Sequence, residues 1–231
     1  MMSGPGVLRS GEIINKEDGC NMQGLIGKKI GMTRIFNETG RVVGVTVIQV
    51  GSNVVEQIKT EENDGYSAVQ LGFQEVEERK VRKPQLGHFQ KLGSAPMKVL
   101  KEFEMDCAED ANLKPGQALG AEVFENVQFV NATGVSKGRG HAGTIKKYNF
   151  QRGRESHGNT NHRERGSSGA GSYPARVMPG LKMSGHMGAC QVTTRRLEVI
   201  GIDKEMGLVF VKGSVPGHRT GIVYLKKFIK K

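Results

Sequence analysis

The sequence has no tryptophan, few aromatic residues and only three cysteines in 231 residues. Cys20, Cys107 and Cys190 are an odd number, are widely spaced and form no C-x-x-C pair, which argues against a disulfide framework and favours a reducing compartment. No run approaches the roughly 18 apolar residues of a membrane span. Residues 1–21 lack the apolar stretch of a secretory signal and carry acids that are unusual in a transit peptide. The sequence therefore predicts a cytoplasmic protein in which residues 1–21 are a disordered leader or a misassigned start.

Acidic residues are scarce in one part of the chain. Residues 131–190 carry 10 Lys and Arg against 2 Asp and Glu, whereas residues 1–130 carry 15 against 18 and residues 191–231 carry 9 against 3. The net charge of +11 therefore comes entirely from beyond residue 130. Because clustered cations repel one another unless a polyanion neutralises them, this pattern indicates a nucleic acid as the first candidate partner and an anionic membrane as the second.

Large apolar residues are also scarce in this segment. They make up 10 of the 60 residues from 131 to 190, which include 12 glycines, but 17 of the 41 residues that follow. Ordering a residue costs about 1–2 kcal/mol of backbone entropy, and ten scattered apolar side chains at about 1.5–3 kcal/mol each do not offset that cost over the whole segment. The segment is therefore either a disordered linker or an extension that becomes ordered on a partner. Its basic charge favours the extension.

The flanking regions are rich in β-branched and apolar runs separated by turns that contain glycine. The expected strands are residues 42–50, 66–73, 197–202, 208–211 and 222–225. A short helix is expected at 86–92, within a small α+β insertion at about 75–101. Short strands at this spacing indicate a barrel or a sandwich. We therefore predict a mainly β globular domain formed by residues 22–130 and 191–231, interrupted by an irregular basic extension at 131–190.

Gly138, Gly140 and Gly143 have the G-x-G-x-x-G spacing of a dinucleotide-binding loop. That loop requires a strand ending at the first glycine and a helix followed by a second β-α unit, and neither is predicted here. A phosphate-binding loop of the Walker type would need a lysine where Thr144 stands. Two interpretations remain for the glycines: they allow the backbone to approach phosphates, or they form a flexible solvated loop.

Two further patterns resemble metal or catalytic sites, namely His157 with His162 and His186 with Cys190. Zinc needs three or four ligands, and no second compact pair stands at a suitable spacing. A Cys/His nucleophile would need an orienting acid, and the only acids of the segment are flanked by arginines. We therefore expect no metal, no cofactor and no enzymatic activity. The stretch 180–196 is equally compatible with core packing and RNA contact, and the C-terminal YLKKFIKK with an edge strand or a phosphate-binding strip.

Five motifs in order resemble the bacterial-type third large-subunit ribosomal protein, the L-three family. They are GLIGKKIGMTRIF (24–36), TGVSKGRGHAGTIKKYNF (133–150), SHGNTNHRERGSSG (156–169), GLKMSGHMG (180–188) and VKGSVPG (211–217). The resemblance implies a β-barrel related to those of translation factors, with a long loop that reaches into large-subunit ribosomal RNA toward the peptidyl transferase centre. It also implies a role in early subunit assembly beside neighbouring ribosomal proteins, with neither a membrane nor a small-molecule substrate as partner.

Together, the charge distribution and the resemblance select the residues expected to bind RNA. They are Lys28, Lys29, Arg34, Lys137, Arg139, His141, Lys146, Lys147, Arg152, Arg154, His157, Asn159, His162, Arg163, Arg165, Ser167, Arg176 and Lys182. Some bacterial relatives carry a methylated glutamine near the tip of the loop, where this chain has Ala170, so that modification is not expected. The alternative function is a free RNA-binding regulator that acts outside the ribosome.

Overall fold

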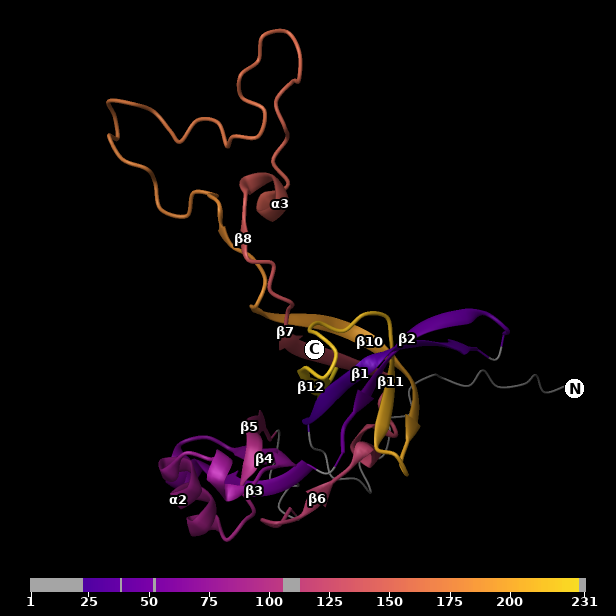
Figure 1. The fold of residues 1–231 in the computed structure, drawn as a ribbon. Coiled ribbons are helices and arrows are strands. Elements are labelled where there is room, and N and C mark those ends of the chain that lie inside the picture. The colour runs from indigo at the N-terminus through magenta and orange to yellow at the C-terminus, as the bar shows by residue number, and fades with distance from the viewer. Residues whose placement is uncertain (1–22, 38, 52, 106–112, 229–231) are drawn as a thin grey trace, which may run out of the picture.

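The computed structural model describes residues 23–37, 39–51, 53–105 and 113–228, so the expected leader at 1–21 lies outside the described residues. Six antiparallel strands close a barrel in the order β1-β12-β7-β10-β11-β2 (Figure 1). The barrel strands are β1 (Gly24–Phe36), β2 (Val42–Gln49), β7 (Phe129–Val135), β10 (Gln191–Asp203), β11 (Leu208–Lys212) and β12 (Ile222–Lys227). The prediction of a mainly β fold built on a barrel is confirmed.

The barrel interior is filled by side chains that alternate along each strand. On β11 and β12 the fully buried residues are two apart, namely Val209 and Val211, and Val223 and Leu225. This period of two places one face of each strand inside the barrel, and each buried side chain contributes about 1.5–3 kcal/mol. At the seam where β1 meets β12, a Cβ on Gly24 would lie 2.2 Å from the carbonyl oxygen of Leu225. Glycine is therefore required for the barrel to close there.

A second sheet, with the order β5-β4-β3-β6, is inserted between β2 and β7 of the barrel. Its strands are β3 (Asn53–Lys59), β4 (Ala68–Glu75), β5 (Met97–Glu104) and β6 (Ala118–Leu119), and its short helical turns are α1 (Glu61–Asp64), η1 (Glu78–Lys80) and η3 (Ala121–Phe124). The helix α2 (Lys83–Leu92) begins three residues before the expected one, and it ends at Gly93 in a left-handed C-cap. Its Phe89 is 2% exposed and anchors it to the sheet. No helix in the described part of the chain is long and apolar enough to cross a membrane.

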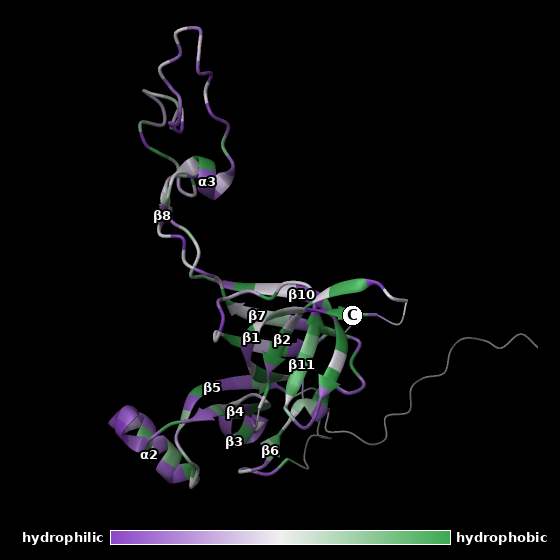
Figure 2. Cartoon of the chain, turned by 45° about the vertical axis from the view of Figure 1, so that its right-hand side comes forward, coloured by the Kyte–Doolittle hydropathy of each residue, from purple (hydrophilic) through white to green (hydrophobic). Residues whose placement is uncertain are grey.

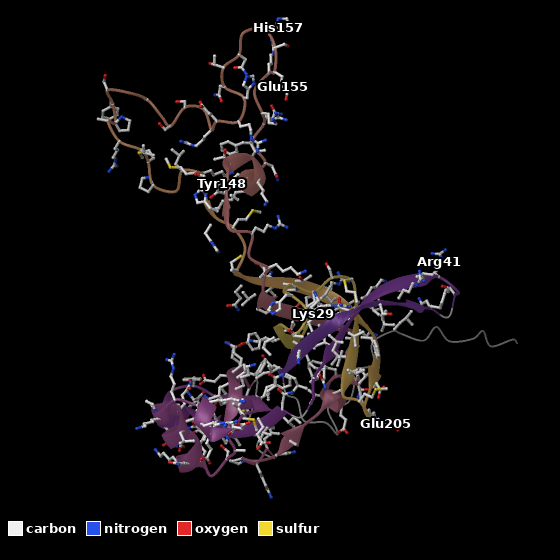
Figure 3. The ribbon with its side chains drawn as sticks, viewed as in Figure 1. Lys29, Arg41, Tyr148, Glu155, His157 and Glu205 are labelled. Carbon is white, nitrogen blue, oxygen red and sulfur yellow. The ribbon has the colours of Figure 1, made fainter. Side chains whose placement is uncertain are left out.

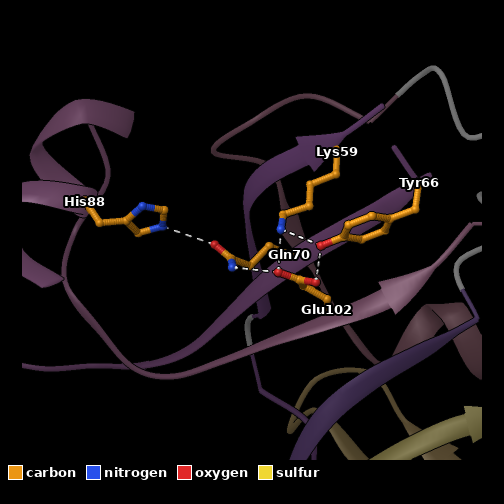
Figure 4. A network of polar contacts seen from close by, with 5 residues as sticks. All are labelled: Lys59, Tyr66, Gln70, His88 and Glu102. Atoms are coloured by element: carbon orange, nitrogen blue, oxygen red, sulfur yellow. Dashed lines mark hydrogen bonds and ion pairs between the residues drawn. The ribbon is translucent and has the colours of Figure 1, made fainter. Parts of the chain in front are cut away.

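A chain of polar contacts also links α2 to this sheet (Figure 4). His88 hydrogen-bonds Gln70 at 3.2 Å, and Gln70 donates to Glu102 at 3.3 Å. Glu102 also accepts from Tyr66 at 2.9 Å and forms an ion pair with Lys59 at 2.9 Å. The hydrogen bonds to Tyr66 and Glu102 raise the pKa of Lys59, and the hydrogen bond from Lys59 is the main cause of the lowered pKa of Glu102. The network orients α2, although contact with solvent keeps the ion pair between Lys59 and Glu102 weak.

The inserted sheet and the barrel share one continuous apolar core. Where β3 begins, the fully buried side chain of Asn53 satisfies the backbone of the neighbouring strand β1. Its amide donates to the carbonyl of Ile26 at 3.0 Å and to that of Val50 at 2.9 Å, and its oxygen accepts from the Ile26 amide at 3.0 Å. Because buried backbone groups must be paired, this one side chain holds the junction between the two sheets.

Between β7 and β10 the chain leaves the barrel and forms a long, thin projection (Figure 1). We call residues 136–190 the arm. It contains only the two-residue strands β8 (His141–Ala142) and β9 (Gly185–His186) and the single-turn helix α3 (Thr144–Tyr148). Within the arm only Ala142 and Thr144 are buried, and Figure 2 shows little apolar colour along it compared with the barrel strands. β7 pairs with β10 as far as Val135, so the barrel ladder includes the first residues of the predicted extension.

Candidate nucleic-acid interface

The arm begins with two antiparallel segments that we call the neck, residues 136–140 and 187–190. Four backbone hydrogen bonds of 2.8–3.2 Å join them, from the amides of Ser136, Arg139, Met187 and Ala189. Gly188 lies at φ +77°, and a Cβ there would lie 2.1 Å from the carbonyl oxygen of Lys137 and 3.0 Å from the Cα of Gly138. Gly188 therefore serves the close approach of two chain segments, whereas a Cβ on Gly138 would make only an ordinary contact of 3.8 Å and Gly140 supplies a positive φ of +65°.

Above the neck, an aromatic ring joins the outgoing and returning halves of the arm. Tyr148, at the end of α3, has the Nζ of Lys147 5.2 Å and that of Lys182 5.8 Å from its ring centroid. The ring of Phe150 lies 6.2 Å away. Cation–π attraction of this kind contributes about 0.5–1 kcal/mol at exposed sites. The contacts of Tyr148 thus hold the two halves of the arm together in the absence of an apolar core. Figure 3 shows this residue at the base of the wide outer part of the arm.

Farther out, residues 153–162 form a closed loop that we call the lobe. The side-chain amide of Asn159 donates to the carbonyls of Arg154 at 2.7 Å and Asn161 at 3.1 Å, and its oxygen accepts from the Asn161 amide at 3.2 Å. The amide of Gly153 donates to the carbonyl of His162 at 3.1 Å. His157 lies at the outer end of the lobe (Figure 3). One asparagine therefore gives the lobe a definite backbone shape.

Most of the residues predicted to bind RNA lie on the arm, and the majority are open to solvent. The exposed ones are Arg34, Lys137, Arg139, His141, Lys146, Arg152, Arg154, His157, His162, Arg163, Ser167, Arg176 and Lys182. The half-buried ones are Lys28, Lys147, Asn159 and Arg165. Lys28 and Arg34 lie apart from the arm on β1, Arg34 within the β1–β2 hairpin that projects from the barrel in another direction (Figure 1).

Lys29 differs from the expectation, because it is only 9% exposed. Its Nζ donates to the carbonyl oxygens of Val215 at 2.6 Å and Gly217 at 3.3 Å. Burial lowers the pKa of Lys29, and the positive charge of Lys137 lowers it further. The side chain fastens the loop that follows β11 to β1 and has no free surface for a phosphate, so we exclude it from the candidate interface.

The cations of the arm are almost unpaired within the described chain. Its two acids are Glu155 and Glu164, and the one ion pair that the arm makes joins Glu155 to Arg152 at 2.8 Å. Apart from Arg152, the basic residues of the arm therefore carry charge that forms no ion pair with a described acid. Such a surface attracts polyanions over several ångströms.

The arm also exposes apolar side chains, of which the sequence reasoning considered only those in the stretch 180–196. Tyr173 is 87% exposed, Met178 52%, Val177 49%, Met183 41% and Leu181 37%. Met183 therefore does not pack in the core, which was one of the two interpretations of the stretch 180–196. Exposed apolar residues on a segment without its own core indicate a surface that a partner covers. The signal in the sequence was the cluster of these residues between glycines 171 and 185.

Comparison with known proteins is consistent across the chain. The family model described as Ribosomal protein L3 matches residues 44–208. A protein of Alkaliphilus metalliredigens named large ribosomal subunit protein uL3 is 46% identical over 209 residues, which cover 90% of this chain and 99% of the relative. Proteins of the same name from Picosynechococcus sp. and Thiobacillus denitrificans are 48% and 47% identical over 84% and 90% of this chain, and over 91% and 97% of their own lengths. The resemblance stated from the motifs is confirmed, and the chain belongs to the ribosomal protein L3 family.

Proposed function

We propose that the chain is a structural component of the large ribosomal subunit that binds ribosomal RNA through its arm. Family membership supports the structural role, because the relatives carry the name of a large-subunit protein and not of an enzyme. The location then follows that of the ribosome, which is cytoplasmic in bacteria.

The observation that carries the RNA-binding part is the unneutralised charge of the arm. Twelve of the predicted residues on the arm are exposed, eight of them lysines or arginines, and the one ion pair that the arm makes with a described residue joins Arg152 to Glu155. When these cations neutralise phosphates, the counterions condensed on the RNA are released, which drives binding and makes it steeply salt-dependent. Glycine-rich backbone lets the arm pass between RNA helices, where a domain with a core of its own would not fit.

Different parts of the arm suit different contacts. The exposed cations of the neck, Lys137 and Arg139, bring charge to the point where the arm leaves the barrel. The lobe presents Arg154 and His157 on a backbone shaped by Asn159, and His157 is suited to a phosphate or a 2′-hydroxyl. The exposed ring of Tyr173 is suited to stacking on an unpaired base.

The same arrangement supports a role in assembly. An arm without a core becomes ordered when RNA surrounds it, and the RNA that it contacts then has fewer alternative folds. We propose that the barrel positions the protein at the subunit surface among neighbouring ribosomal proteins, while the arm supports early assembly and shapes RNA near the peptidyl transferase centre. Its effect on peptide transfer is indirect, since it supplies no catalytic group.

The proposal is tested by titrating the full chain against protein-free large-subunit RNA over a range of salt concentrations. The RNA is extracted from bacterial ribosomes. Arg154→Ala should make the slope of log K against log salt less steep by about 0.7–0.9. Arg79→Ala is the matched control, because Arg79 is exposed on the inserted unit and paired with Glu77, so it should leave the slope unchanged. A wild-type chain without saturable, salt-dependent binding would reject the RNA-binding role.

The alternative, a free RNA-binding regulator, is separated by sedimentation. A structural protein of the large subunit travels with large subunits on a sucrose gradient at moderate salt. A chain found only in lighter ribonucleoprotein fractions would favour the regulator.

A further inference from the structure

A β-bulge interrupts the ladder between β10 and β7 on the outer wall of the barrel. Thr194 pairs with Ala132, and the next pair is Leu197 with Val130, so Arg195 and Arg196 both stand opposite Asn131. Arg196 lies at φ +53°, and its amide donates to the side-chain oxygen of Asn131 at 2.9 Å. A left-handed conformation of a residue other than glycine costs about 1–3 kcal/mol and is typical of functional positions. Bulges of this kind reorient side chains.

The bulge places the guanidinium of Arg196 over an aromatic ring. Its central carbon lies 5.1 Å from the centroid of Phe129, which in turn meets the edge of Phe228 at 6.4 Å and 79°. The guanidinium therefore lies over the ring, and its N–H groups make no hydrogen bond or ion pair with any described residue. An unpaired guanidinium can bind a phosphate with two parallel hydrogen bonds through its planar fork.

Further donors lie on neighbouring strands of the same wall. Lys226 of β12 stands opposite Asn131, so both side chains lie on one face of the sheet. Two residues farther along β7, the hydroxyl of Thr133 lies 2.8 Å from that of Thr193 on β10. We call Arg195, Arg196, Phe129, Lys226, Thr133 and Thr193 the wall patch.

No described acid neutralises the wall patch. Arg195, Arg196 and Lys226 form no ion pair with any residue that the structure describes, and the nearby Glu198 is paired with Lys212 at 2.6 Å. The patch is also continuous with the arm, because β7 and β10 run from it directly into the neck. The same polyanion can therefore contact both.

We propose that the wall patch is a second RNA-binding surface, which holds phosphates of the RNA next to the segment that encloses the arm. This inference rests on the proposed function. The edge of the Arg196 guanidinium binds a phosphate bidentately, Arg195 and Lys226 add charge, and the threonine hydroxyls are suited to 2′-hydroxyl groups. RNA is favoured over an acidic protein surface because of the hydroxyl donors and the continuity with the arm.

The test compares full-length double variants in binding to protein-free bacterial large-subunit RNA. Arg195→Ala with Arg196→Ala should make the salt slope less steep by about 1.4–1.8 and lower the affinity by roughly 25- to 60-fold at 0.1 M salt. Lys114→Ala with Lys204→Ala removes the same formal charge from exposed positions outside the patch. Lys114 precedes β6 of the inserted sheet, and Lys204, which pairs with Glu125, is in the β10–β11 turn beside Glu205, at the end of the barrel away from the arm (Figure 3). This control should lower the affinity by less than about threefold and leave the slope unchanged.

An Arg152→Ala with Arg154→Ala variant keeps this test separate from that of the proposed function. If the arm variant lowers the slope and the wall variant behaves like its control, the wall patch does not bind RNA and the arm proposal stands. If no variant changes the slope, the proposed function itself fails. If the wall variant binds RNA normally but enters large subunits poorly, the patch binds a protein, and the inference is overturned.

Arg196→Lys tests the geometry rather than the charge. The lysine keeps the positive charge but loses the planar fork, so the slope should stay the same while the affinity falls about three- to tenfold. An affinity equal to that of the wild type would show that the stacked guanidinium has no special role.

Discussion

The side chain of Asn53 and the backbone of Ile26 are paired in both directions, with donor–acceptor distances of 3.0 Å each way. Asn53 is fully buried, and its side-chain amide pairs with β1 as the backbone of a neighbouring strand would. The junction between the barrel and the inserted sheet thus depends on one polar side chain within an apolar core.

Asn53→Ala should lower the free energy of unfolding by about 2–4 kcal/mol, because it leaves the Ile26 amide and carbonyl and the Val50 carbonyl buried without partners. Urea denaturation followed by circular dichroism measures the change. Asn63→Ala is the control, since Asn63 is exposed and makes a single contact of 3.4 Å, and its effect should stay within about 0.5 kcal/mol. Equal stabilities of the two variants would contradict the assigned role of Asn53.

Gly188→Ala should disrupt the neck without unfolding the barrel. The new methyl group would meet the carbonyl of Lys137 at 2.1 Å, and the residue would keep a positive φ. Strain of about 1–3 kcal/mol in the bound conformation corresponds to a loss of RNA affinity of roughly 5- to 150-fold. Gly171→Ala, in open space on the same arm, should bind as the wild type does. A melting temperature lowered as much as the affinity would indicate that the neck belongs to the barrel core.

Asn159→Ala should loosen the lobe alone. The three hydrogen bonds of its side chain contribute about 0.5–1.5 kcal/mol each, so amide exchange at Asn161 and Gly153 should become faster by roughly one to three orders of magnitude. Hydrogen exchange read by NMR measures this, with the barrel amides as internal reference. In Asn161→Ala the backbone groups that Asn159 uses remain, so exchange should change little. Similar exchange in both variants would remove Asn159 from its assigned role.

Glu56 should make stability depend on pH. It is 1% exposed at the bulge in β3, and neither carboxylate oxygen has a hydrogen-bond partner among the described residues. Burial raises its pKa above the ordinary 4.5, and the nearby Ser94 and His88 offset this only in part. The favourable contribution of the protonated form is therefore complete below 4.5 and is lost as the pH rises through the higher pKa of the folded state.

Glu56→Gln should consequently raise the free energy of unfolding at about pH 7 and have little effect at about pH 4, where the wild-type carboxyl is already neutral. Denaturation series at both pH values measure the difference. Glu104→Gln, at an exposed position of β5, should show no such dependence. If the Glu56 variant were less stable than the wild type at neutral pH, the carboxylate would have a partner that stabilises it.

Much of the fold could be predicted because the strands have strong local signals. The β-branched run at 42–50 became β2, residues 208–211 became most of β11, and the helix expected at 86–92 lies within α2. The arm could be predicted because a segment without a core of its own has few apolar residues, and this one also has many cations.

The remainder depends on contacts between residues far apart in sequence. Two adjacent lysines, Lys28 and Lys29, look alike in the sequence, and only the fold brings the carbonyl of Val215 to one of them. The bulge that carries Arg195 and Arg196 becomes evident only when β10 is paired with β7. Asparagine is a residue type typical of loops, and the burial of Asn53 follows from how the two sheets meet.

The order of the barrel strands has a consequence for synthesis on the ribosome. β10, β11 and β12 follow the arm in the chain, yet β10 and β12 flank β7, and β12 pairs with β1 to complete the barrel. Because a polypeptide emerges from its N-terminus onward, the whole arm leaves the exit tunnel before the barrel that anchors it is able to close. A newborn chain thus presents its polycationic segment to the cell while its hydrophobic strands still await their partners, and this interval is when a chaperone would be needed most.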